Sequence, residues 1–187
     1  MKIHVHRHHS KNRGRWCRSY FRRGSGLVEL NMAIAFTLQH YLESRGVDYE
    51  IVEHPYADTG LTTAERAHIP ADKLAKSIIL EDEGGYVMAV CPASRRIKLG
   101  DLYRETNRRL EFADEAELAD MLGDCVLGAG PPVGELYGVD VVVDTDLFLQ
   151  PDIYFEAGDH VDLIHVSAEG FQALMSNAEH ASFSKPI

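Results

Sequence analysis

The chain has 187 residues, of which 45% are hydrophobic and 26% are charged. These proportions are ordinary for one globular domain, and no segment reaches the ~18 consecutive apolar residues of a membrane-spanning helix. The three cysteines, Cys17, Cys91 and Cys125, form no CxxC motif. Such sparse use of cysteine argues against a disulfide framework and favours a reducing, cytoplasmic environment.

The net charge of −10 combines two unlike parts of the chain. Residues 1–31 contain eight Lys or Arg and one acid, whereas residues 32–187 contain eleven Lys or Arg and 28 acids. The first part lacks hydrophobic periodicity and the apolar run of a secretory signal. We therefore predict a basic, disordered extension over residues 1–31 and a single domain over residues 32–187. Contact with nucleic acid and organellar targeting stay open as roles of the extension.

The first elements of the domain follow from hydrophobic periodicity. A helix is predicted over residues 33–46, with Gly46 suited to end it in a left-handed conformation. Its apolar side chains share one face of the helix: Ile34, Leu38, Tyr41 and Leu42. A strand is predicted over residues 47–54, ending before Pro55.

The next segment predicts a short helix and then a β-hairpin. Thr62 and Glu65 stand three residues apart, which is the spacing of a capping box at a helix start. Two apolar runs, residues 77–80 and 86–91, flank an Asp-Glu-Gly-Gly turn and indicate the hairpin. Lys76 lies at the mouth of the first run, next to residues that should be buried.

The rest of the domain alternates between helices, strands and one loop rich in Gly and Pro. Helices are predicted over residues 97–106, 114–123 and 167–175 (with Ser167 as N-cap), strands over 108–113 and 139–144, a loop over 126–138, and a hairpin over 152–166 turning at Gly158 and Asp159. Strands joined by tight turns pair in an antiparallel manner. We therefore predict an α/β fold of the α+β kind, with a mixed, mainly antiparallel, barrel-like sheet and helices packed around it.

Common catalytic motifs are missing from the sequence. It contains no GxSxG, HExxH or GxxxxGK[ST] motif, and no GxGxxG after a predicted strand. The histidines of the extension, His4, His6, His8 and His9, lack companion ligands at metal-site spacing. We therefore expect no metal, no cofactor and no side-chain nucleophile of a familiar type.

Three features could nevertheless bind a ligand, and each has an alternative interpretation. Lys76 either lays its stem along apolar surface with the ammonium in solvent, or directs the ammonium into a cleft. The segment "GAGPPVG", residues 128–134, is a surface loop or a loop whose amides approach a ligand. The segment "EAGDH", residues 156–160, is a hairpin turn or a second backbone site with a polar side chain at its rim.

The order of these features is similar to that in a known family. Over about residues 33–183 the chain resembles the YbaK / prolyl-tRNA synthetase-associated domain family, which includes free-standing trans-editing deacylases of aminoacyl-tRNA. The resemblance is carried by "LESRGVDYEIVEHP", "TTAERAHIPADKLAKSIIL", "GGYVMAVCPASRRIKLGDL", "VLGAGPPVG" and "YFEAGDHVDLIHVS". It implies the hydrolysis of mischarged aminoacyl-tRNA, with a small amino acid such as Ala or Cys on tRNA(Pro) as the substrate.

The resemblance also implies roles for individual residues. Lys76 stands at the family's lysine, which orients the aminoacyl-tRNA end, and the loop amides would stabilise the oxyanion. The implied catalytic set is Lys76, Gly128 and Gly130, and the implied substrate-binding set is His54, Pro131, Gly158 and His160.

The acidic domain has one basic segment that suits a tRNA partner. Arg95, Arg96, Lys98 and Arg104 form either a solvated surface or a contact with the acceptor stem. The predicted partners are aminoacyl-tRNA and, in addition, an aminoacyl-tRNA synthetase, with no membrane; the oligomeric state is left open. Two alternative functions remain, a non-catalytic module that binds aminoacyl-tRNA or a synthetase, and a hydrolase of other small aminoacyl esters.

Overall fold

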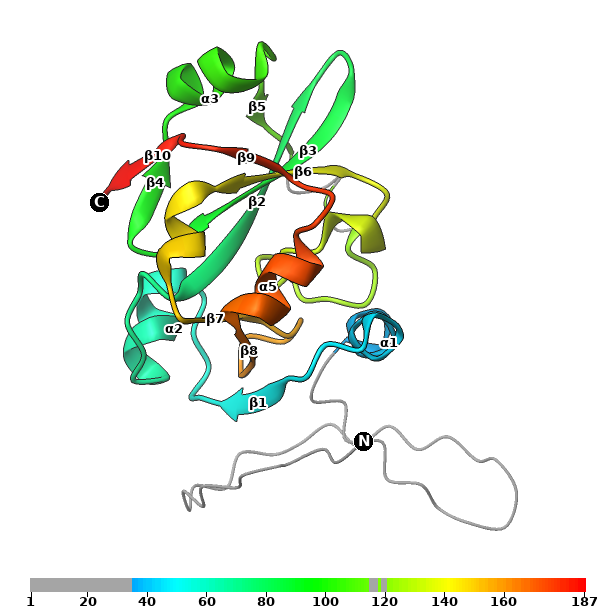
Figure 1. Ribbon diagram of the computed structural model, residues 1–187, viewed down its shortest axis with the longest axis vertical. Helices are drawn as coiled ribbons and strands as arrows, with labels where there is room; N and C mark the ends of the chain where they lie inside the picture. Colours follow the sequence, from blue (N-terminus) through cyan, green and yellow to red (C-terminus); the bar gives the residue numbers. More distant parts are fainter. Residues whose placement is uncertain (1–34, 115–117, 119–120) are drawn as a thin grey trace.

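A mixed β-sheet runs through the centre of the protein in the computed structural model, which describes residues 35–114, 118 and 121–187 (Figure 1). In chain order the elements are α1 (Phe36–Arg45), β1 (Glu50–Glu53), α2 (Gly60–Arg66), β2 (Leu74–Asp82), β3 (Gly85–Pro92), β4 (Arg95–Ile97), α3 (Leu99–Thr106), β5 (Glu111–Phe112), the 3-10 helix η1 (Gly134–Leu136), β6 (Asp140–Asp144), the 3-10 helix η2 (Thr145–Leu149), β7 (Asp152–Glu156), β8 (Asp162–Ser167), α5 (Ala168–Leu174), β9 (Glu179–Ala181) and β10 (Ser184–Pro186). The predicted extension and half of the helix predicted over 114–123, namely residues 115–117, 119 and 120, lie outside the described residues.

The sheet mixes antiparallel and parallel pairs, which confirms the predicted fold class. Its strands follow the order β1-β8-β7-β2-β3-β6-β9, and β5 pairs with β2 beside this path. The hairpin partners β2–β3 and β7–β8 are antiparallel, whereas β2–β7, β3–β6 and β6–β9 are parallel. Strands β4 and β10 form a separate antiparallel pair.

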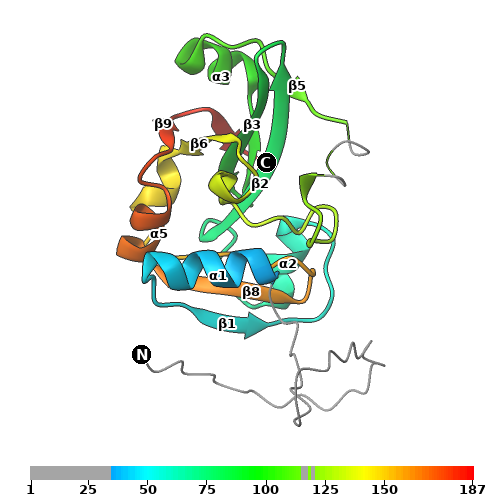
Figure 2. The ribbon, with the colours of Figure 1, turned by 90° about the vertical axis from the view of Figure 1, so that its right-hand side faces the viewer.

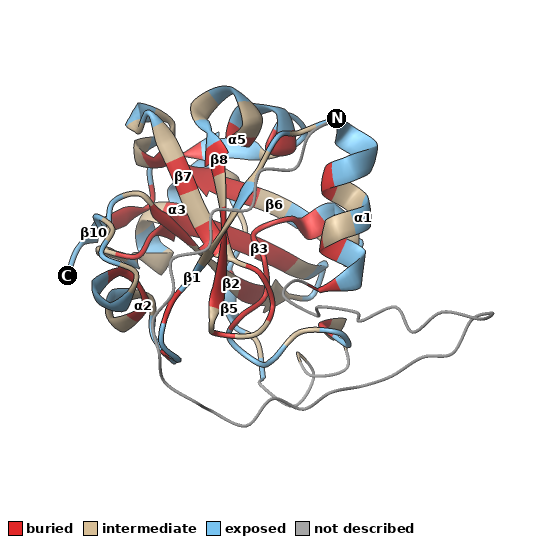
Figure 3. Ribbon diagram, turned by 90° about the horizontal axis from the view of Figure 1, so that it is seen from below, coloured by how far each residue is buried: buried red, intermediate tan, exposed pale blue. Residues whose placement is uncertain are grey.

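Helices cover both faces of this sheet. The alternation of side chains along β3 shows why, because Met88 and Val90 enter the cluster formed with α1 and α5, while Ala89 and Cys91 enter the cluster formed with α3. Figure 2 shows α1 and α3 at opposite ends of the molecule. In Figure 3 the buried residues follow the central strands, and the outer surface of α1 is exposed.

Local sequence signals account for several boundaries. Helix α1 ends at Gly46, whose φ of 63° is left-handed as predicted. The Ser167 hydroxyl accepts a hydrogen bond from the Gly170 amide at the start of α5, which confirms the predicted N-cap. The β7–β8 hairpin turns at Gly158 and Asp159 as predicted.

Other boundaries were wrong. The N-cap of α2 is Thr59, and Thr62 is its third residue, because these two threonines satisfy each other's amides in the capping box. Strand β2 starts at Leu74, so Lys76 lies within the strand. The predicted helix over 97–106 begins only at Leu99, because residues 95–97 pair with β10. The strands predicted over 47–54 and 108–113 are shorter than expected.

Candidate active site

A gap along one edge of β2 creates a small cavity. That edge pairs with β7 at Leu74 and Ala75 and with β5 at Leu80 and Glu81, and no strand pairs with it between these points in the described chain. The Gly-Pro loop over residues 126–138 fills the space, and the Ser77 hydroxyl donates to the Gly130 carbonyl at 2.7 Å. The remaining space has a volume of about 30 Å³. Its lining includes Asp58, Thr59, Gly60, Leu74, Ala75, Lys76, Ser77, Gly128, Gly130, Glu156 and His160.

The Lys76 side chain is half-buried in the wall of this cavity. Its Nζ donates a hydrogen bond to the Arg95 carbonyl at 2.5 Å, and the described residues offer it no second acceptor within hydrogen-bond distance. An ammonium has three N–H donors, so two remain for a ligand. The side chain therefore lines the cavity and carries donors that the protein does not use, and its role in binding a ligand stays a prediction.

The Gly-Pro loop brings backbone donors to the same cavity. Gly128 has a φ of 87°, a left-handed conformation that glycine adopts without strain. The amide N–H groups of Gly128 and Gly130 donate to no acceptor in the described part of the chain. Unpaired amides beside a cavity can stabilise an oxyanion, and this role of the loop stays a prediction.

Contacts between the Gly-Pro loop and the β7–β8 hairpin complete the cavity. The His160 ring nitrogen Nε2 lies 2.9 Å from the Leu127 carbonyl, and the Val126 amide donates to the Gly158 carbonyl at 2.8 Å. A Cβ on Gly128 would lie 3.5 Å from the His160 ring. These contacts hold His160 buried at the wall, with its other ring nitrogen unpartnered among the described residues.

The structure adds a carboxylate that the sequence did not identify as functional. Glu156, the last residue of β7, places its side chain in the cavity and accepts a hydrogen bond from the buried Thr63 hydroxyl at 3.2 Å. Burial raises the pKa of Glu156 to about 7, and nearby Asp159 adds to the increase while Thr63 opposes it. A charged residue inside an alternating apolar strand, two positions before a left-handed glycine, was the available signal.

Three of the predicted substrate-binding residues lie near the cavity without lining it. Pro131 is buried next to Gly130, and Gly158 is packed against Ala35 and Cys125. His54 is buried after β1, and its Nδ1 lies 2.9 Å from the Pro55 carbonyl. Burial lowers the pKa of His54, which favours the neutral ring.

The predicted basic segment lies over β4 and α3, and two of its arginines are already paired. Arg95 forms an ion pair with Asp146, and Arg104 with Asp101. Arg96 is exposed and Lys98 is half-buried, so these two side chains have the greater freedom to contact a phosphate.

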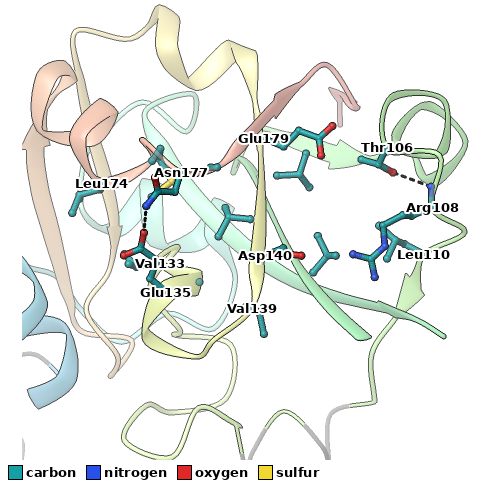
Figure 4. A pocket seen from close by; sticks show the side chains of 16 residues that line it. Thr106, Arg108, Leu110, Val133, Glu135, Val139, Asp140, Leu174, Asn177 and Glu179 are labelled. Carbon is teal, nitrogen blue, oxygen red and sulfur yellow. Dashed lines mark hydrogen bonds between the residues drawn. The ribbon is translucent and has the colours of Figure 1, made fainter. Parts of the chain in front are cut away.

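A larger cavity of about 380 Å³ lies between β6, β9 and the ends of α3 and α5, away from these residues (Figure 4). Several of its polar groups bind one another. Asn177 donates to Glu135 at 2.6 Å, and the Arg108 amide donates to the Thr106 hydroxyl at 3.2 Å. The Arg108 guanidinium is bound to Asp82. The small cavity is therefore the better candidate, since the Gly128 and Gly130 amides and two N–H donors of Lys76 have no partner among the described residues.

The described residues contain neither a cluster of metal ligands nor a helix that could span a membrane. No group of three or more His, Cys, Asp or Glu side chains in that part of the chain is arranged to hold a metal ion. No helix among the described residues has the length and apolar character needed to cross a membrane.

Comparison with known proteins assigns the chain to a family. The model of the aminoacyl-tRNA editing domain matches residues 54–174. The chain belongs to this family. The matched range includes every residue that lines the small cavity. A search of curated proteins found no match.

Solved structures agree with the assignment to the editing-domain family. A protein described as a candidate trans-editing enzyme for prolyl-tRNA synthetase superimposes with a TM-score of 0.72 at 25% identity, covering 83% of this chain and 99% of that one. A scaffold used for the computational grafting of linear epitopes matches with the same TM-score at 24% identity, covering 84% of this chain and all of the scaffold. A hypothetical protein matches with a TM-score of 0.70 at 19% identity, covering 80% of this chain and 99% of that one. The last two likenesses show the fold alone.

Proposed function

We propose that this editing domain hydrolyses mischarged aminoacyl-tRNA in trans and removes a small amino acid such as Ala or Cys from tRNA(Pro). The observation that carries the proposal is the convergence of Lys76, the Gly128 and Gly130 amides and His160 on one cavity.

The chemistry of the proposed reaction suits these groups. An aminoacyl ester is already activated, so positioning and charge stabilisation supply most of what hydrolysis needs. Lys76 would orient the terminal adenosine phosphate or the ester end through its two remaining N–H donors. The amides of Gly128 and Gly130 would stabilise the tetrahedral oxyanion. Water assisted by a ribose hydroxyl, or the side chain of the substrate, would be the attacking group.

The tRNA itself would contact the basic segment beside the cavity. Lys76 and this segment are linked through the Arg95 carbonyl, and Arg96 and Lys98 would contribute phosphate contacts from the same segment. Few such contacts predict modest affinity with a shallow dependence on salt. A cytoplasmic location and docking to a synthetase remain predictions that accompany this function.

The decisive experiment is a deacylation panel across mischarged tRNAs with wild type, Lys76→Ala and Lys73→Ala. We expect Lys76→Ala to slow ester loss by roughly 100-fold or more, because the removal of one positioned donor commonly costs that much. Lys73 lies three residues earlier and pairs with Asp152 at 2.6 Å outside the cavity, so Lys73→Ala should retain activity.

Each outcome of this panel decides between the functions. Wild-type rates in Lys76→Ala would contradict the assignment of the lysine. Tight binding of aminoacyl-tRNA by wild type without ester loss would favour the non-catalytic module. Turnover of small aminoacyl esters, with none of aminoacyl-tRNA, would favour the general esterase.

A further inference from the structure

Glu156 is a buried carboxylate with an unused oxygen in the small cavity. Its side chain is only 13% exposed. One oxygen, Oε1, accepts the hydrogen bond from Thr63, and the other, Oε2, is buried and has no hydrogen-bond partner among the described residues. A buried acceptor without a protein donor is costly, so the position of Oε2 in the wall of this cavity suits a donor group of a ligand.

The charges around Glu156 indicate what that group is. The nearest basic atom is His160 Nδ1, at 4.0 Å, beyond hydrogen-bond distance. Lys76 lines the same cavity but directs its ammonium to the Arg95 carbonyl. The other nearby ionisable groups, Asp58, Asp159 and Asp162, are acidic. The described residues therefore give this carboxylate no cation within hydrogen-bond distance, which agrees with its raised pKa.

We infer that Glu156 binds the α-ammonium of the aminoacyl group and makes the site selective for a free α-amine. This inference rests on the proposed function and deepens it. The α-ammonium is the cation common to all aminoacyl esters, and an ion pair with Glu156 would hold it in the cavity that Lys76 also lines. Acylation removes the charge of this amine, so N-acylated and peptidyl esters would be rejected.

Selection for a free amine has a consequence for translation. A hydrolase that accepted any ester of tRNA would also cleave peptidyl-tRNA. A carboxylate that requires an ammonium partner excludes such substrates, because the acylated nitrogen is uncharged and would leave Glu156 buried without a counter-ion. Selectivity of this kind comes from the penalty on the wrong ligand as well as the gain from the right one.

A binding experiment tests the inference without relying on turnover. The two probes are 3′-alanylamino-3′-deoxyadenosine, whose amide link resists hydrolysis, and its N-acetyl form, each titrated into full-length protein at pH 7. We expect wild type to bind the free amine ten- to a hundredfold more tightly, as hydrogen bonds to charged groups contribute about 1.5–3 kcal/mol. Equal affinity for the two probes, or no binding of either, would overturn the inference.

Variants identify the residue responsible. Glu156→Gln keeps the shape and should bind both probes about equally, whereas the rim variant Asp58→Asn should retain most of the preference of wild type. Loss of preference in Asp58→Asn alone would overturn the inference, as would a preserved preference in Glu156→Gln. The melting temperature of each variant reports its folding, and the wild-type preference is decisive even where Glu156→Gln fails to fold.

The outcome is separable from that of the proposed function. Preference for the free amine without hydrolysis of any aminoacyl-tRNA would support the role of Glu156 and contradict the deacylase. Hydrolysis of alanyl-tRNA(Pro) and N-acetylalanyl-tRNA(Pro) at equal rates would support the deacylase and contradict the role of Glu156.

Discussion

The two cavities of this protein differ in volume and in the number of polar groups without a partner, and the smaller cavity has more of these groups. The larger, at about 380 Å³, is lined by polar groups that bind one another, as Asn177 and Glu135 do. The smaller, at about 30 Å³, is lined by Lys76 with its unused donors, by two glycines with unpaired amides and by the buried carboxylate of Glu156. Polar groups that lack partners mark a binding site more clearly than volume does, because burying them without a ligand costs free energy.

A change to the backbone around the small cavity should cause the largest loss of deacylation. Gly128→Ala would force a side chain onto a φ of 87° and place its Cβ 3.5 Å from the His160 ring. We expect roughly a 100-fold loss of deacylation, since the loop amide would move away from the oxyanion. The assay is ester loss from alanyl-tRNA(Pro).

The matched control for this change is Gly138→Ala. Gly138 also has a positive φ, of 66°, but no atom lies within 4 Å of its added Cβ. Both variants should lose a similar stability of about 1 kcal/mol from backbone strain. Equal losses of activity in the two variants would show that the contribution of Gly128 is only structural.

Asp162, in the hairpin beside the small cavity, should lower the stability of the protein as pH rises. Burial, aided by the nearby Asp159 charge, raises the pKa of Asp162 to about 8. The folded state therefore holds a proton that the unfolded chain releases near pH 4, and stability falls as pH rises from about 4 to about 8. Asp162→Asn should remove this loss and stabilise the protein by more than about 1 kcal/mol at pH 8. Urea unfolding at several pH values measures the stability of both proteins. The same pH dependence of stability in wild type and Asp162→Asn would refute the prediction.

At the larger cavity, Glu135 should affect stability less than Asp162 does, and its stabilising contribution should be lost as pH falls. Hydrogen bonds from Asn177 and Tyr41, and the Arg45 guanidinium, lower the pKa of Glu135. Its contribution is present at neutral pH and lost as pH falls through that lowered pKa. Glu135→Gln should cost about 0.5–1 kcal/mol at pH 7, less in acid, and leave deacylation unchanged, because this half-exposed group is screened by solvent. Reduced deacylation in a folded Glu135→Gln protein would make the larger cavity part of the active site.

Local patterns in the sequence determined much of the fold. Gly46 ends α1, Ser167 caps α5, and both hairpins form where short turns separate apolar runs. These features depend on residues a few positions apart, so propensity and hydrophobic periodicity are sufficient to predict them. Strands β9 and β10 were missed, since three residues carry no periodicity and their partners are remote in the sequence.

The sequence by itself also identified Lys76 and the two glycine segments, because their order resembles that of a family with a shared chemistry. Only the tertiary structure decided that they surround one space. The gap along β2, the contact between the Gly-Pro loop and His160, and the burial of Glu156 all arise where distant segments pack together. The packing of distant segments removes Glu156 from water and leaves its carboxylate without a partner. No local pattern of residues specifies this desolvation.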